Sequence, residues 1–140
     1  MTIKNELIEY AIDCISGNIV SGEKHEWACE RFLNDIEKKE WKYIWNEEKA
    51  QNIITWFTYL KHSKGVLAGQ PINLTAWQKF ILCQIYGWED KKGVRRFKKA
   101  FVEVARKNAK TQMQAGSLLY EISVVATKNN EIAETFCAGI

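Results

Sequence analysis

Residues 101–116 read FVEVARKNAKTQMQAG, and this stretch decides which fold the rest of the chain predicts. Residues that favour β-structure come first, a basic cluster ending in Lys110 and Thr111 follows, and a helical pattern completes the stretch. A strand, a loop ending in Lys-Thr and a helix are the parts of a phosphate-binding loop, whose usual pattern is G-x-x-x-x-G-K-[ST]. The chain has Val104 and Ala109 at the two glycine positions. The residues alone leave two interpretations open, a phosphate loop and a basic turn between a strand and a helix.

Each part of a phosphate loop has a chemical task that restricts the residue type. Backbone N–H groups and the positive end of the helix dipole bind phosphate oxygens. On this alignment Lys110 would reach the outer phosphates, and the Thr111 hydroxyl would bind Mg²⁺. Glycine is preferred where φ is positive, so Ala109 is the smallest replacement but loses easy access to positive φ. Asn108 tolerates the left-handed region better than most residues do.

The positive charge of the chain is concentrated around this loop. Residues 91–110 contain nine Lys or Arg and one Glu, and the rest of the chain contains 11 basic and 16 acidic residues. Arg106 and Lys107 add charge that glycine-rich loops lack. A segment of this kind attracts the phosphates of a nucleotide or of a nucleic acid. A solvated charged loop is the alternative that charge alone leaves open.

The composition indicates a folded chain with a real core. The chain has 140 residues, of which 46% are hydrophobic and 26% charged, and this balance argues against disorder. We find no secretory signal and no apolar run approaching the ~18 residues of a membrane span. The cysteines are far apart and form no C-x-x-C pair, which favours four reduced, buried thiols over a zinc site.

Periodicity and capping signals predict the order of the elements. Helices are expected over residues 4–16, 22–40 and 47–62, and a fourth from Thr75 as N-cap to Gly87. A strand is then expected at 97–105, a helix at 110–127, and the opening of a second buried strand at 135–140. The last three elements form a βαβ unit, whose strands are parallel and whose crossover is right-handed.

The predicted fold class is therefore α/β. A helix-rich N-terminal region at 1–90 leads into the first βαβ unit of a P-loop NTPase at 91–140, with an incomplete parallel sheet. Because two strands alone rarely make a stable sheet, we expect a fragment or an incomplete product of a larger α/β protein.

Three blocks of sequence resemble one protein family. VARKNAKT, at 104–111, resembles the deviant phosphate loop of the large terminase subunit of tailed bacteriophages, which commonly has the form V-x-R-K-N-G-K-[ST]. The stretches at 10–38 and 62–88 resemble its N-terminal helical segment and its L-x-x-W-Q segment, in the same order. Val104 is no departure from the family pattern, whereas Ala109 stands where the family has glycine.

The resemblance implies an ATP-driven motor that packages double-stranded DNA, with an N-terminal ATPase domain and a C-terminal nuclease domain. ATP and Mg²⁺ are the implied cofactors, with Lys110 on the outer phosphates and Thr111 holding Mg²⁺. Arg106 would sense or stabilise the γ-phosphate, and Gln78 would read the adenine edge. Backbone groups of the loop would come from four residues: Ala105, Lys107, Asn108 and Ala109. The implied partners are viral DNA, the small terminase subunit and the portal protein, in the host bacterial cytoplasm and without a membrane.

Several residues keep alternative interpretations at this stage. Gln78 is either the adenine reader or a surface glutamine on an amphipathic helix, and Trp77 is either a core residue or an adenine stacker. Arg95 and Arg96 either contact phosphate or DNA, or belong to a solvated turn.

Catalytic acids are the part of the motor that the sequence does not supply. We recognise no Walker B aspartate, no catalytic glutamate and no cluster of nuclease acids, so whether the chain is an enzyme is uncertain and we expect it alone not to hydrolyse ATP or cut DNA. The alternative function is a non-enzymatic module that binds DNA or a partner through residues 91–110.

Overall fold

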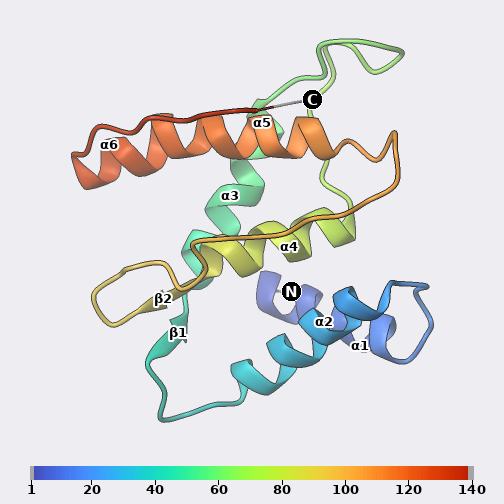
Figure 1. Ribbon diagram of the computed structural model, residues 1–140, viewed down its shortest axis with the longest axis vertical. Helices are drawn as coiled ribbons and strands as arrows, with labels where there is room; N and C mark the ends of the chain where they lie inside the picture. Colours follow the sequence, from blue (N-terminus) through green and yellow to red (C-terminus); the bar gives the residue numbers. More distant parts are fainter. Residues whose placement is uncertain (1, 139–140) are drawn as a thin grey trace. The chain divides into compact units, whose positions relative to one another are not determined.

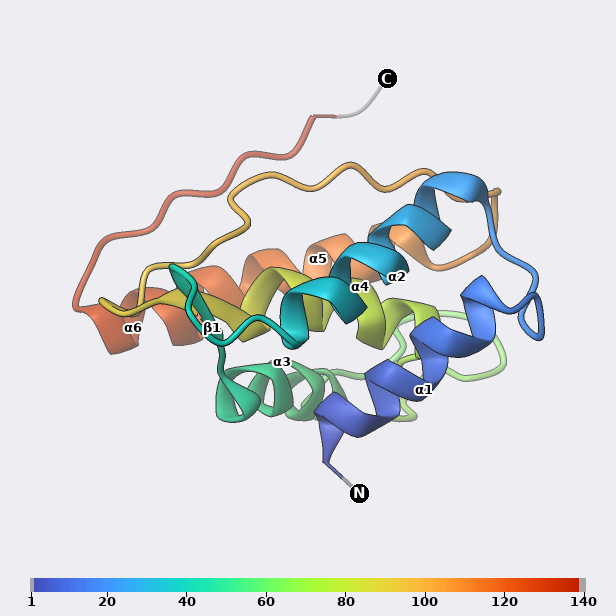
Figure 2. The same cartoon turned by 90° about the horizontal axis from the view of Figure 1, so that it is seen from below.

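A computed structural model describes residues 2–138, and Figures 1 and 2 show its elements. In chain order these are α1 (Ile3–Ile15), α2 (Glu23–Ile36), β1 (Tyr43–Trp45), α3 (Glu47–Tyr59), α4 (Ala76–Gly87), β2 (Trp88–Asp90), α5 (Lys110–Tyr120), the π-helical η1 (Glu121–Val125) and α6 (Ala126–Asn129). The chain divides into two compact units, one of residues 1–55 and 73–100, the other of residues 56–72 and 101–140. The described residues thus form a helix-rich mixed structure with one small sheet. The functional division predicted at residue 90 stays a prediction.

The first unit is built on helices whose apolar residues recur at helical spacing. The Thr2 side chain caps α1 by accepting a hydrogen bond from Asn5 N at 3.3 Å. Because Leu7, Ala11 and Cys14 recur every three or four residues, they lie on one buried face of α1. That face packs against α2 and α4 (Figure 2). The apolar periodicity therefore gives this unit its three-helix core.

The small sheet joins the chain after the C-terminal end of α4 to the chain before α3. β1 and β2 pair antiparallel, with Ile44 opposite Glu89 and Trp45 opposite Trp88. The end of α4 approaches β1 closely, because a Cβ on Gly87 would lie 2.7 Å from Trp45 Cζ3. A glycine is required at that position by this contact.

Aromatic side chains fill the centre of the first unit. The Phe32 side chain has no exposed surface, and its ring centroid lies 5.6 Å from that of Trp45, 5.7 Å from Phe80 and 6.4 Å from Trp88. Edge-to-face contacts of this kind add to the stabilisation from apolar burial. Truncating a buried Phe of this kind to Ala typically costs about 3–5 kcal/mol.

The second unit packs α5 against the end of α3. Phe57 is fully buried, and Gly116 of α5 lies so close to it that a Cβ would come within 2.5 Å of Phe57 Cε1. Trp56 Nε1 donates a hydrogen bond to Gly116 O at 3.0 Å, and the Trp56 ring lies 5.8 Å from that of Tyr120. The small residue in α5 therefore allows the two helices to approach closely.

The structure confirms the predicted helices but changes their ends. The second helix ends at Ile36 rather than residue 40, and the sequence missed β1 and β2, which have three residues each. The helix predicted at 110–127 runs to Asn129 and contains the π-helical residues Glu121–Val125. Strands this short have too little alternation to be recognised.

The predicted parallel strands are not observed in the described residues. Residues 97–105 and 131–138 have no strand hydrogen bonding, and residues 139–140 lie outside the described part of the chain. The expectation of two strands at 97–105 and 135–140 is therefore corrected for residues 97–105 and 135–138. The physical reason is that a strand exists only when a neighbour pairs with it, and β-forming residues alone do not supply a partner. Within residues 2–138, no helix has the length and apolarity needed to cross a bilayer.

Candidate nucleotide-binding loop

The loop at 105–109 has two residues in a backbone conformation that glycine adopts most easily. Ala109 has φ 55° and Lys107 has φ 68°, both in the left-handed region. Asn108, which the sequence favoured for that region, lies between them without a positive φ. Alternation of this kind points successive backbone N–H groups into one concavity, a common anion-binding arrangement.

Asn108 instead closes the loop through its side chain. Its Nδ2 donates a hydrogen bond to Ala105 O at 3.0 Å and lies 3.5 Å from Arg106 O. These contacts hold the start of the loop near its end. All seven residues from 105 to 111 are exposed, so ligand can reach the loop from solvent.

The N-terminus of α5 lies directly after Ala109. Lys110 is the first residue of α5 and Thr111 the second. The first backbone hydrogen bond of the helix runs from Met113 N to Ala109 O at 3.0 Å. The first N–H groups of a helix have no acceptor within it and carry the positive end of its dipole. The predicted phosphate-contacting residues therefore lie at an anion-attracting helix end.

A contact that the sequence did not predict ties this helix end to the rest of the second unit. Gln112 Nε2 lies 3.1 Å from His62 Nδ1, fifty positions away in the chain. His62 begins a turn closed by backbone bonds from its N to Gln70 O and from Gly69 N to its O. No local sequence pattern signals a pair so distant, although His62 belongs to one of the family-like blocks.

Gln78 belongs to the first unit, where it has a structural task. It is buried, and its Oε1 accepts a hydrogen bond from Thr75 N at 3.0 Å in a capping box at the start of α4. The alternative of a surface glutamine is therefore wrong, while its adenine-reading role stays a prediction. Trp77, its neighbour, is half-buried.

The basic segment at 91–110 is not uniformly available to a ligand. Arg96 Nη1 lies 2.7 Å from Asp35 Oδ2 as an ion pair without hydrogen-bond alignment, and the two side chains are 14% and 4% exposed. Its guanidinium lies over four aromatic rings, those of Trp41, Tyr43, Trp88 and Phe97. Arg95 lies over the Tyr86 ring at 4.9 Å. Neither alternative predicted for Arg96, a phosphate contact or a solvated turn, fits this buried position.

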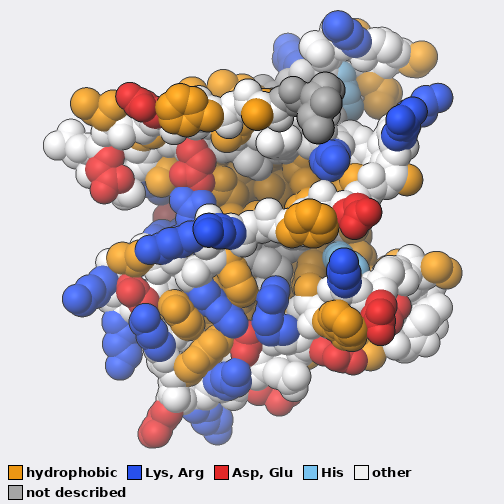
Figure 3. Space-filling view, in the orientation of Figure 1, with side chains coloured by type: hydrophobic (Ala, Val, Ile, Leu, Met, Phe, Trp, Pro, Cys, Tyr) orange, Lys and Arg blue, Asp and Glu red, His pale blue; other side chains and the backbone are white. Residues whose placement is uncertain are grey.

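Other lysines make an exposed basic surface on the first unit. The register of the sheet pairs Tyr43 with Asp90, which places Lys42 and Lys91 at the same end of the two strands. Both are exposed, as is Lys92. Figure 3 shows Lys and Arg side chains gathered over the part of this unit that carries β1 and β2. We call Lys42, Lys91 and Lys92 the sheet-end lysines.

Comparison with known protein families finds a similarity over this same region. The sequence model described as "Terminase large subunit, ATPase domain" matches residues 76–138, which include α4, the loop and α5. No curated protein and no solved structure matches the chain. This match confirms the resemblance for residues 76–138, which hold the loop and the end of the 62–88 block.

Proposed function

We propose that residues 101–116 are the phosphate loop of an ATP-driven DNA-packaging motor, and that they bind Mg²⁺-ATP. The observation that carries the proposal is the left-handed backbone of Ala109 directly before the first residue of α5. This is the position at which the family has glycine, and glycine is favoured where φ is positive. The chain thus keeps the backbone of a glycine loop although it carries a methyl group there.

The side chains have separate tasks in this proposal. Lys110 would neutralise charge on the outer phosphates, and the Thr111 hydroxyl would be a ligand of Mg²⁺. Arg106, at the start of the loop, stabilises the charge that develops on the γ-phosphate during transfer. Backbone groups from Ala105 to Ala109 bind the remaining phosphate oxygens, and Gln78 reads the adenine.

In the proposed P-loop core, residues 101–105 would form a strand, and their pattern of exposure fits that role. Exposure alternates along this stretch, with Val102 and Val104 half-buried and Phe101, Glu103 and Ala105 exposed. Alternation with a period of two is typical of a strand with one covered face. We propose that residues 101–105 and the chain after residue 131 become parallel strands when further strands of the ATPase domain pair with them.

In the complete motor, hydrolysis of ATP would drive movement of double-stranded viral DNA into the procapsid. The small terminase subunit and the portal protein are the proposed partners, and a nuclease domain would cut the DNA. These proposals rest on the family alone, and the host cytoplasm is the compartment that follows from them.

The direct test is nucleotide binding by the chain and two variants. We expect a fluorescent ATP analogue with Mg²⁺ to bind the wild-type chain and to bind the Lys110→Ala variant at least ~10-fold more weakly, since a charge-assisted bond to phosphate is lost. Lys128→Ala removes an exposed lysine near the end of α6 and is the matched control. Equal affinity in the wild type and Lys110→Ala would contradict the assignment of the loop.

A second test uses the intact protein. Lys110→Ala in the full-length terminase subunit is expected to abolish ATPase activity and DNA packaging, because both depend on the same phosphate contact. Persistent packaging in that variant would show that the loop lies elsewhere.

A second candidate function is binding of duplex DNA by the sheet-end lysines, without any enzymatic role. Their clustering at one end of the sheet is the observation that favours it. Binding through lysines releases counterions, so the affinity should fall steeply as salt increases. We expect Lys91→Ala with Lys92→Ala to weaken binding of a labelled duplex and to reduce the salt slope. If ATP competes with the DNA, or if the double variant binds normally, this candidate fails.

A further inference from the structure

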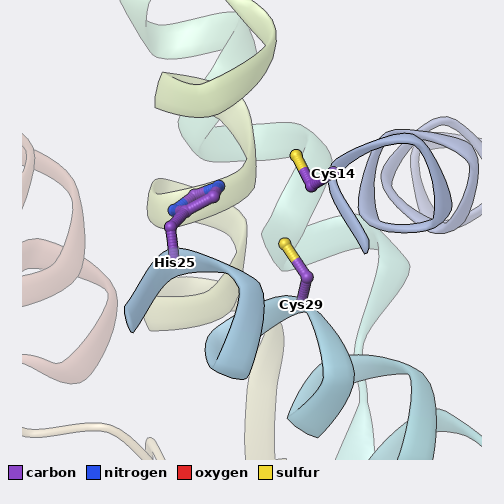
Figure 4. Close-up of side chains that lie close together, drawn as sticks. All are labelled: Cys14, His25 and Cys29. Atoms are coloured by element: carbon purple, nitrogen blue, oxygen red, sulfur yellow. The ribbon is translucent and has the colours of Figure 1, made fainter. Parts of the chain in front are cut away.

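Two cysteines and a histidine converge inside the first unit. Cys14 comes from α1, and His25 and Cys29 come from α2 (Figure 4). One ligand atom from each, the two Sγ atoms and an imidazole nitrogen, lies within 4.8 Å of the other two. The thiols are 1% and 0% exposed, and the histidine is half-buried. Among residues 2–138, no other group of three His, Cys, Asp or Glu side chains lies close enough together to hold a metal ion.

The sequence produces this convergence through helix geometry rather than through a short motif. His25 and Cys29 are four residues apart on α2, so their side chains lie on the same face. Cys14 is in the last turn of α1, and the connection at 16–22 turns the chain so that α1 packs against α2. Ligands on two helices do not form a C-x-x-C pattern, which is why the cysteine spacing argued against a zinc site.

The ligand set matches the preferences of Zn²⁺. Thiolate and imidazole are its commonest ligands, and sites with three protein ligands leave a fourth position open. Tetrahedral bonds of about 2.3 Å to sulfur and about 2.0–2.1 Å to nitrogen place the ligand atoms about 3.5–3.8 Å apart. The present spacing therefore needs a contraction of about 1 Å, which small side-chain rotations supply. We propose that Cys14, His25 and Cys29 form a Zn²⁺ site that joins α1 to α2.

Tyr10 belongs to the same cluster. Its hydroxyl lies 2.9 Å from His25 Nε2, and its ring packs against His25 and Phe80. The aromatic contacts fix the plane of the imidazole. The Tyr10 contact occupies Nε2, so a metal ion would bind either Nδ1 or, by displacing the Tyr10 hydroxyl, Nε2.

The role of the ion would be structural. Binding replaces the protons of the two thiols, which are released to solvent, and the free energy of metal binding adds to that of folding. The link is between α1 and α2, whose connection contains Gly17 and Gly22. A zinc ion would therefore fix the helical hairpin that begins the chain.

The experiment measures metal bound by the reduced full chain. After treatment with a chelator, addition of Zn²⁺ and removal of the excess, we expect one equivalent of zinc by elemental analysis. Co²⁺ in its place should give thiolate charge-transfer absorption together with the visible bands of tetrahedral cobalt. Tyr10→Phe keeps all three ligands and is expected to retain one equivalent.

Matched cysteine variants identify the ligands. Cys14→Ser and Cys29→Ser are each expected to lose stoichiometric binding, while Cys137→Ser, which changes an exposed thiol elsewhere, keeps it. Circular dichroism of each metal-free variant shows whether that variant is folded. If a variant is unfolded, the zinc stoichiometry of the wild-type chain still tests the proposal. The proposal would be overturned if the reduced wild-type chain bound no zinc. It would also be overturned if zinc binding were lost in Cys137→Ser. A Cys14–Cys29 disulfide in a chain that binds no metal once reduced would likewise overturn it.

Discussion

Arg96 and Asp35 form a nearly buried ion pair, with Nη1 2.7 Å from Oδ2. Lys38 Nζ also bonds the carboxylate, at 2.7 Å from Oδ1. Removing the arginine from such a pair leaves a poorly compensated buried charge, which typically costs about 3–5 kcal/mol. We expect Arg96→Met to reduce the free energy of unfolding by roughly 3 kcal/mol, at the low end because Lys38 remains. Denaturation in urea measures it, with Lys98→Met, an exposed change, as the control. A loss below 1 kcal/mol would show that the pair is not desolvated.

The same carboxylate predicts how stability depends on pH. Burial raises the pKa of Asp35, but the hydrogen bond from Lys38 and the positive charges of Lys38 and Arg96 outweigh it and hold the pKa below its usual value of 3.8. A depressed folded-state pKa stabilises the fold above the unfolded pKa, and this contribution is lost as pH falls through the folded value. We expect the urea midpoint of the wild type to fall more steeply below pH 4 than that of Asp35→Asn. Parallel curves for the two proteins would contradict the assignment.

Ala109 carries a backbone conformation that suits glycine better. The left-handed region costs a non-glycine residue about 1–2 kcal/mol, while glycine elsewhere costs roughly 0.5–1 kcal/mol in chain entropy. Ala109→Gly is therefore expected to raise the free energy of unfolding by roughly 0.5–1 kcal/mol. Ala105→Gly, in the same loop but without positive φ, should be neutral or destabilising. Thermal or urea unfolding of the two variants side by side checks the difference, and equal effects would show that residue 109 is unstrained.

Gly116 sets the approach of α5 to the end of α3. A methyl group there would lie 2.5 Å from Phe57 Cε1 and 3.1 Å from Leu60 Cδ1, so one of these side chains must move. Overpacking of this kind costs about 1–3 kcal/mol. We expect Gly116→Ala to destabilise the chain by that amount although alanine favours helix, and Gln114→Ala, on an exposed position of α5, to change stability little. A stabilised Gly116→Ala protein would mean that the two helices are not in close contact.

Local signals in the sequence located the helices well. Thr75 as N-cap and the apolar spacing of α1 and α4 depend on neighbours within one or two turns, and the structure confirms them. The strand expected at 97–105 failed because β-structure needs a partner that no local pattern supplies. Charge counting likewise does not tell which of the nine basic residues at 91–110 are accessible, and Arg96 pairs with Asp35, which is distant in sequence.

The candidate site was predictable to the same extent. The positions of Lys110 and Thr111 at the start of a helix follow from local periodicity, and the structure places them there. The contact between Gln112 and His62 and the convergence of Cys14 with Cys29 arise from tertiary packing. Cys137 is exposed, so the expectation of four buried thiols holds only for the other three. Reading spacing along one helix cannot reveal groups that two helices bring together.

The side-chain oxygen of Gln78 accepts a hydrogen bond from the backbone N–H of Thr75, so the oxygen and the nitrogen of this amide have different roles. The oxygen completes the start of α4, and the amide nitrogen is the donor that the proposed recognition of adenine would use. A base that this donor recognises would present an acceptor, as the ring nitrogens of adenine do. A glutamate at this position would keep the helix start and lose the donor, so folding and base selection are separable at a single atom of one side chain.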